Sequence, residues 1–154
     1  MKTYYDTGIL LKLYMGEASS EAVQHFVHSR GESLAVTDLH LSECVSAMKL
    51  RAFRRECRDE EASEGIGLIM EDLKSGVLRL IEVDWPRTWH ECRLTSEKFA
   101  SSTGVRTLDA LHVATARLCG AQELVTTDAR QSRLAARVGL RVIDPTRRRG
   151  KRNV

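Results

Sequence analysis

The sequence predicts an α/β fold, namely a three-layer α/β/α sandwich around a five-stranded, mostly parallel sheet. Short apolar runs alternate with longer segments of helical periodicity, and connections of helical length are typical of parallel strands covered on both faces. The chain has 154 residues, 42% hydrophobic and 29% charged, which suits one domain with a single core. Aromatic residues make up only 5%, which favours helices packed on an aliphatic sheet over a base-stacking platform.

In the first half of the chain, two short apolar runs are separated by segments in which apolar residues recur at helical spacing. Ser19 or Ser20 is suited to cap a helix that Gly31 ends. The acidic residues from Asp59 onward suit the first turn of a later helix, where the helix dipole favours negative charge. The expected elements are strands at 2–5 and 33–37 and helices at 7–15, 20–29, 38–57 and 59–74.

The second half begins with the clearest strand, VLRLIEV at 77–83, which is rich in β-branched and other apolar residues. Pro86 fits the first turn of the helix that follows. Glycines at 104, 120 and 139 stand where the last three helices are expected to end. The expected elements are strands at 77–83, 123–126 and 140–143 and helices at 86–102, 107–119 and 129–138.

Charge is distributed unevenly along the chain. The net charge is +3, but five of the 24 basic residues fall within 147–152, so the 19 that remain face 21 acidic residues and residues 1–146 carry −2. We expect one domain at 1–146 and a basic, disordered tail at 147–154. Asp6 and Lys12 interrupt the first apolar stretch, and no apolar run is long enough to span a membrane, so neither a signal peptide nor a membrane partner is expected. Four scattered cysteines without a Cys-x-x-Cys pair favour reduced thiols and a cytoplasmic location.

Four acidic residues stand at positions where chemistry is expected. Asp6 and Asp128 follow predicted strands, and ligands of open parallel sheets bind at the carboxyl ends of strands. Glu43 and Asp109 lie on predicted helices, on faces that are otherwise apolar. A carboxylate held near a packed surface is costly unless it is paired or bound to a metal.

Grouped at one end of the sheet, these four carboxylates would form an oxygen-rich pocket suited to Mg²⁺ or, as a substitute, Mn²⁺. Such a pocket favours metal-assisted hydrolysis of a phosphodiester, because the metal lowers the pKa of water and neutralises transition-state charge. Purely structural interpretations remain open: Asp109 or Asp128 could cap a helix, and Glu43 could pair with Lys49 or Arg51.

Four separated segments occur in the order typical of a known family: YYDTGILLKLY, LSECVSAM, RTLDALHVATA and ELVTTDARQSRLAARVGLRVI. In these segments the chain resembles the PIN-domain ribonucleases, and most closely the VapC-type toxins of toxin–antitoxin pairs. The resemblance implies that Asp6 and Asp109 are the principal metal ligands, that Glu43 and Asp128 complete the pocket, and that Thr126 supplies a supporting hydroxyl. It also implies a five-stranded parallel sheet, cleavage to a 3′-hydroxyl and a 5′-phosphate, a homodimer, and a small antitoxin encoded beside the toxin.

The predicted function is therefore a Mg²⁺-dependent endoribonuclease that acts on RNA as the toxin of a type II toxin–antitoxin system. One alternative is a non-catalytic PIN-type module that binds RNA or regulates. Another is a receiver-type phosphoacceptor, of whose acidic pattern only Asp84 is present. The tail at 147–152 could contact RNA phosphates, and His112 is expected to be packed or hydrogen-bonded near the site.

Overall fold

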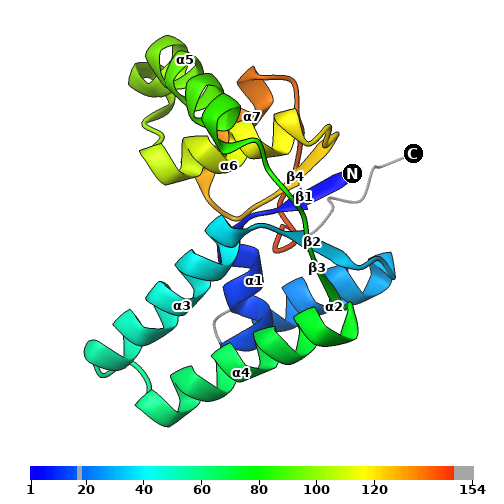
Figure 1. Ribbon diagram of the computed structural model, residues 1–154. Coiled ribbons are helices and arrows are strands. Elements are labelled where there is room, and N and C mark those ends of the chain that lie inside the picture. Colours follow the sequence, from blue (N-terminus) through cyan, green and yellow to red (C-terminus); the bar gives the residue numbers. More distant parts are fainter. Residues whose placement is uncertain (17–18, 148–154) are drawn as a thin grey trace.

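The computed structural model describes residues 1–16 and 19–147, and within them parallel strands are interleaved with helices (Figure 1). The α/β class is confirmed, and helices such as α2 and α5 end at predicted glycines, Gly31 and Gly104, both with φ above 60°. The order is β1 (Thr3–Tyr5), α1 (Thr7–Tyr14), α2 (Ser20–Arg30), β2 (Leu34–Val36), α3 (Asp38–Phe53), α4 (Asp59–Ser75), β3 (Leu78–Leu80), α5 (Trp85–Thr103), α6 (Thr107–Leu118), β4 (Glu123–Val125), α7 (Ala129–Arg137) and β5 (Arg141–Ile143).

The strands form two parallel sheets, which corrects the prediction of one five-stranded sheet. One sheet has the order β1-β4-β5, with Tyr5 opposite Val125 and Val125 opposite Ile143. The other pairs β2 with β3, with Leu34 opposite Leu78. The five strands of the described chain are each three residues long, so each offers few backbone groups for pairing.

A histidine side chain bridges the place where the two sheets meet. His40, on α3, is fully buried; its Nδ1 accepts from the backbone N–H of Thr37 (3.0 Å) and its Nε2 donates to the carbonyl of Tyr5 (2.8 Å). These two backbone groups follow β2 and end β1, respectively. The imidazole therefore joins the ends of β1 and β2 through a side chain, where the prediction assumed a continuous backbone ladder.

Strand β1 lies between the two hydrophobic clusters that the described residues form. Tyr5 packs in a cluster with Ile9 of α1 and Met48 of α3, whereas Tyr4 packs in a cluster with Leu111 of α6. Alternate side chains of a strand point to opposite faces, so a strand buried on both faces separates two layers of helices. Figure 1 shows α1–α4 on one side of β1 and α5–α7 on the other.

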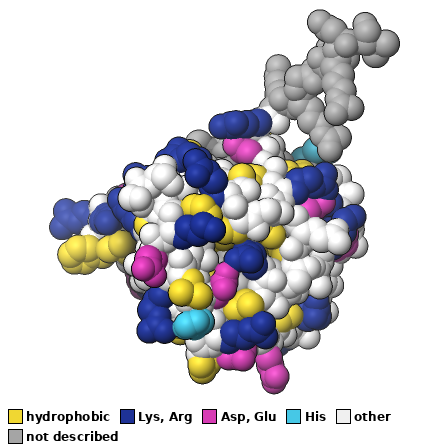
Figure 2. All heavy atoms as spheres, turned by 90° about the horizontal axis from the view of Figure 1, so that it is seen from above, with side chains coloured by type: hydrophobic (Ala, Val, Ile, Leu, Met, Phe, Trp, Pro, Cys, Tyr) yellow, Lys and Arg dark blue, Asp and Glu magenta, His cyan; other side chains and the backbone are white. Residues whose placement is uncertain are grey.

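The surface carries charge of both signs. On the face shown in Figure 2, Lys and Arg side chains are spread among acidic, apolar and neutral groups. Residues 148–154, most of the predicted basic tail, lie outside the described residues. Among the helices of the described chain, none combines the length and the apolar character needed to cross a bilayer.

Candidate metal centre

All four acidic residues singled out in the sequence line the same pocket, which has a volume of about 560 Å³. Asp6 directly follows β1, and Asp128 is the third residue after β4, which ends at Val125. These strands are paired and parallel, so their carboxyl ends are adjacent. Glu43 comes from the middle of α3 and Asp109 from the first turn of α6. The four differ in depth: Asp6 is buried, Glu43 and Asp109 are partly buried, and Asp128 is exposed at the rim.

Asp6 lies at the floor of the pocket and is 6% exposed. Its Oδ1 accepts from the backbone N–H of Ile9 (2.8 Å), which caps α1, and its Oδ2 accepts from the hydroxyl of Thr126. The Thr126 oxygen also accepts from the backbone N–H of Asp128 (3.0 Å), so this fully buried threonine connects two of the acidic residues. Burial raises the pKa of Asp6, and the negative charge of Asp128 raises it further, although the bonds from Thr126 and Ile9 oppose the shift.

Asp109 and Asp128 also line the pocket, and their charges interact. Burial raises the pKa of Asp109, and the charge of Asp128 adds to that shift. Asp128 Oδ1 accepts from the backbone N–H groups of Arg130 and Gln131, both at 2.7 Å, so the predicted role of this residue as a possible helix cap is correct for α7. Asp128 therefore raises the pKa of two neighbouring carboxyls, a like-charge arrangement that a cation would relieve.

Glu43 is held by α1 and α6 rather than by a neighbouring basic residue on its own helix. Its Oε2 accepts from the hydroxyl of Thr7 (2.5 Å) and from Nε2 of His112 (2.6 Å). Lys49, one of the two partners considered from the sequence, instead binds Asp59 (2.8 Å). Burial acts to raise the pKa of Glu43, but the bonds from His112 and Thr7 outweigh it, and the pKa lies below its ordinary value. Glu43 is therefore ionised at neutral pH.

The histidine beside Glu43 belongs to a buried polar network. His112 is 3% exposed, and because an ionised carboxylate has no proton to give, Nε2 carries the hydrogen and donates to Glu43. Its Nδ1 lies 2.8 Å from the hydroxyl of Tyr4, and its ring lies 4.8 Å from that of His40 between centroids. The histidine expected to be packed or hydrogen-bonded near the site is thus both, and it lines the pocket.

The sequence profile of the PIN domain family matches residues 3–137, a range that contains all four acidic residues. The chain belongs to the PIN domain family. No curated protein matches the chain. PIN domains are typically nucleases; they bind nucleic acid and generally use divalent metal ions.

The donor set of this PIN domain has the chemistry that a hard divalent cation requires. Carboxylate oxygens are the ligands preferred by Mg²⁺, which binds one or two of them and keeps several waters. Within residues 1–16 and 19–147, however, no three His, Cys, Asp or Glu side chains are grouped closely enough to hold a metal ion as they stand. The carboxyls share the pocket while Asp6 and Asp128 also cap helices and Glu43 binds His112. The residues therefore fit a metal by type and by shared location, and a cation would have to draw their side chains together.

One residue of the PIN site was missed in the sequence analysis. Gln131, on α7, is 1% exposed and lines the pocket between two of its acidic residues. Its backbone N–H binds Asp128, its Nε2 donates weakly to the carbonyl of Asp109 (3.4 Å), and its Oε1 is buried without a hydrogen-bond partner. Its position three residues after Asp128, one helical turn on, is the signal that could have identified it. Its amide oxygen is a hard acceptor buried beside this site, and the described residues offer it no hydrogen-bond partner.

Proposed function

We propose that this protein is a metal-dependent endoribonuclease, with Mg²⁺ as cofactor and Mn²⁺ as a substitute. The observation that carries the proposal is the placement of Asp6, Glu43, Asp109 and Asp128, from four separate segments of a PIN domain, around one pocket. Four carboxylates in a pocket are costly unless their charge is balanced. A divalent cation supplies that balance and also the chemistry of phosphodiester hydrolysis.

In the proposed reaction, Asp6 and Asp109 are the principal metal ligands, and Glu43 and Asp128 complete the site. A bound Mg²⁺ would lower the pKa of the attacking water and neutralise charge on the scissile phosphate. Thr126 orients the Asp6 carboxylate by donating to its Oδ2.

The bonds from Thr7 and His112 hold Glu43 ionised and directed toward the pocket. Glu43 is thereby suited to hold a water or to accept a proton.

The biological role we propose is that of a toxin of a type II toxin–antitoxin system. The four motifs that resemble VapC-type toxins support it, and the same resemblance suggests a homodimer and a cognate small antitoxin. The scattered cysteines favour a cytoplasmic location. The alternative is a non-catalytic PIN-type module that binds RNA or has a regulatory role. The lack of a finished ligand set among the described residues favours that alternative, whereas the presence of all four acidic residues favours the nuclease.

Cleavage of total bacterial RNA by the purified protein, with Mg²⁺ and with EDTA, separates the two functions. We expect cleavage only with the metal, and its loss in Asp6→Asn and Asp109→Asn. Asp84→Asn is the matched control, because Asp84 caps α5 as Asp6 caps α1 but lies outside the acidic pocket. Equal cleavage by the parent and by both site variants would show that the site is wrong. A small DNA-binding protein encoded beside this gene would support the toxin role, and its absence would weaken it.

A further inference from the structure

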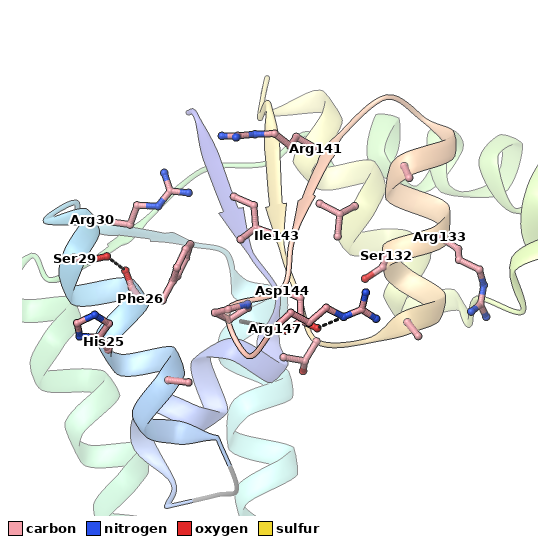
Figure 3. A pocket seen from close by; sticks show the side chains of 16 residues that line it. His25, Phe26, Ser29, Arg30, Ser132, Arg133, Arg141, Ile143, Asp144 and Arg147 are labelled. Carbon is pink, nitrogen blue, oxygen red and sulfur yellow. Dashed lines mark hydrogen bonds and ion pairs between the residues drawn. The ribbon is translucent and has the colours of Figure 1, made fainter. Parts of the chain in front are cut away.

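A second cavity, of about 1220 Å³, lies beside the acidic pocket. It runs between α2 and α7 along β5, an outer strand of its sheet (Figure 3). Thr127, which precedes Asp128, lines both cavities, so the two are neighbours at the carboxyl end of β4. A chain that leaves the acidic pocket past Thr127 would lie along the second cavity.

The second cavity has the opposite charge to the first. Four arginines from separate segments line it, and the only carboxylate among its lining residues is Asp144. We call this cavity the arginine groove. Its four arginines are Arg30 of α2, Arg133 of α7, Arg141 of β5 and Arg147.

A buried carboxylate fixes two of these arginines in place. Glu123, on β4, is 1% exposed and accepts from Arg30 (2.8 Å), from Arg141 and from the hydroxyl of Thr3 (3.2 Å). One carboxylate facing two guanidinium groups leaves a net positive charge. Each guanidinium has five N–H donors, so both retain donors for another acceptor. Figure 3 shows Arg30 and Arg141 near one end of the groove.

The opposite end of the groove carries Arg147, and apolar groups lie between. Arg147 is 82% exposed and pairs with Asp144 at 3.2 Å. Phe26 and Ile143 are half-buried and project into the middle of the groove (Figure 3). Arg30 also lies over the ring of Phe26, 5.0 Å from its centroid. The groove thus offers cationic ends and an apolar, partly aromatic floor, which suits a strand with a charged backbone and flat bases.

We propose that the arginine groove binds the phosphate backbone of single-stranded RNA adjacent to the scissile bond. The inference rests on the proposed nuclease function and names where its substrate lies. Carboxylates repel a polyanion, so the nucleotides flanking the cleaved phosphate need a cationic surface that begins where the acidic pocket ends. The groove adjoins the pocket at Thr127, and its arginines extend from Arg147, which follows β5, to Arg30 and Arg141 at the amino end of β4 and β5. An acidic polypeptide is the other ligand that arginines attract, and the test distinguishes it.

The test measures RNA binding in EDTA, so that cleavage does not enter the result. Fluorescence anisotropy with a labelled RNA of about 12 nucleotides gives the affinity at several salt concentrations. The binding constant K falls as the salt concentration rises, and each lost phosphate contact makes the slope of log K against log salt less steep by about 0.7 for a single strand. We expect this decrease for Arg141→Gln and for Arg147→Ala, and about twice as much for the double variant.

Arg58→Ala is the matched control, because Arg58 is 74% exposed and pairs with Glu61 three residues away at 3.2 Å, as Arg147 pairs with Asp144. Thermal unfolding of each variant verifies that it is folded. A change in Arg147→Ala alone would assign binding to the basic tail and overturn the inference, as would parental slopes in both variants. Displacement of RNA by polyglutamate at equal charge concentration would assign the groove to an acidic polypeptide.

The outcome is separable from that of the nuclease proposal. RNA binding that depends on Arg141 and Arg147, in a protein that cuts no RNA with Mg²⁺, would overturn the nuclease proposal and retain the groove as an RNA site. Cleavage of RNA by the parent, together with unaltered RNA binding in both groove variants, would overturn the groove proposal and retain the nuclease proposal.

Discussion

Replacing Asp6 with asparagine tests whether its buried charge is held for a cation. Asparagine keeps the oxygen that accepts from Ile9, so the cap of α1, which contributes about 1 kcal/mol, is retained. The change removes one negative charge from the floor of the pocket, where burial and Asp128 already raise the pKa of Asp6. We therefore expect the metal-free variant to be more stable than the parent at pH 7.

The magnitude of the metal effect follows from linkage. Mg²⁺ at 100 times its Kd stabilises a folded protein by about 2.7 kcal/mol. For a chain of this size, each kcal/mol raises Tm by about 2–4 °C, so the parent should gain about 5–11 °C. Asp6→Asn should gain almost nothing, whereas Asp84→Asn, which alters a cap outside the pocket, should gain as much as the parent.

Differential scanning calorimetry with Mg²⁺ and with EDTA measures both effects, and their pH dependence supplies a check of sign. The folded-state pKa of Asp6 lies above its ordinary value of 3.8, so the folded protein binds this proton more tightly than the unfolded chain. The destabilisation by Asp6 is therefore full above the raised pKa and disappears as the pH falls through it toward 3.8. The advantage of Asp6→Asn should shrink over the same range. An equal Mg²⁺ shift in parent and variant, or an advantage independent of pH, would refute the reasoning.

Three further predictions concern the residues around the carboxylates. Burial lowers the pKa of His40 to about 3 from 6.5, so the free energy of unfolding should fall as the pH drops from 6.5 toward 3. His40→Leu should remove this pH dependence. At pH 7 the same variant should lose about 2–4 kcal/mol in urea unfolding, because the N–H of Thr37 and the carbonyl of Tyr5 lose their partner. His112→Phe should lower Mn²⁺ affinity by about 10–100-fold in titration calorimetry, since Glu43 loses an orienting donor; unchanged affinity would exclude that role. Gln131→Leu should raise the free energy of unfolding of the metal-free protein by about 1 kcal/mol, because it removes an unpartnered oxygen. The same variant should bind Mn²⁺ more weakly. A variant that is stabilised but binds Mn²⁺ as the parent does would show that this oxygen is not a ligand.

The local pattern of the chain was sufficient for the elements and for the location of the acidic residues. Apolar periodicity and glycine positions depend on neighbours within a few residues, so the order of strands and helices could be predicted. Asp6 and Asp128 could be placed together because parallel strands share a carboxyl edge. Glu43 and Asp109 could be recognised as acidic residues on apolar helix faces, because helical spacing shows which face of a helix a residue occupies.

The partners of those residues were decided by contacts between distant segments. The sequence by itself determined the α/β class, the charge of the body and the four carboxylates that one pocket would contain. Only the tertiary structure decided that His40 joins two separate sheets, that His112 holds Glu43 across 69 positions, and that Glu123 gathers Arg30 and Arg141 at the amino end of β4 and β5. The physical reason is that periodicity identifies the face of an element on which a residue lies, whereas the group it meets there depends on how remote elements pack.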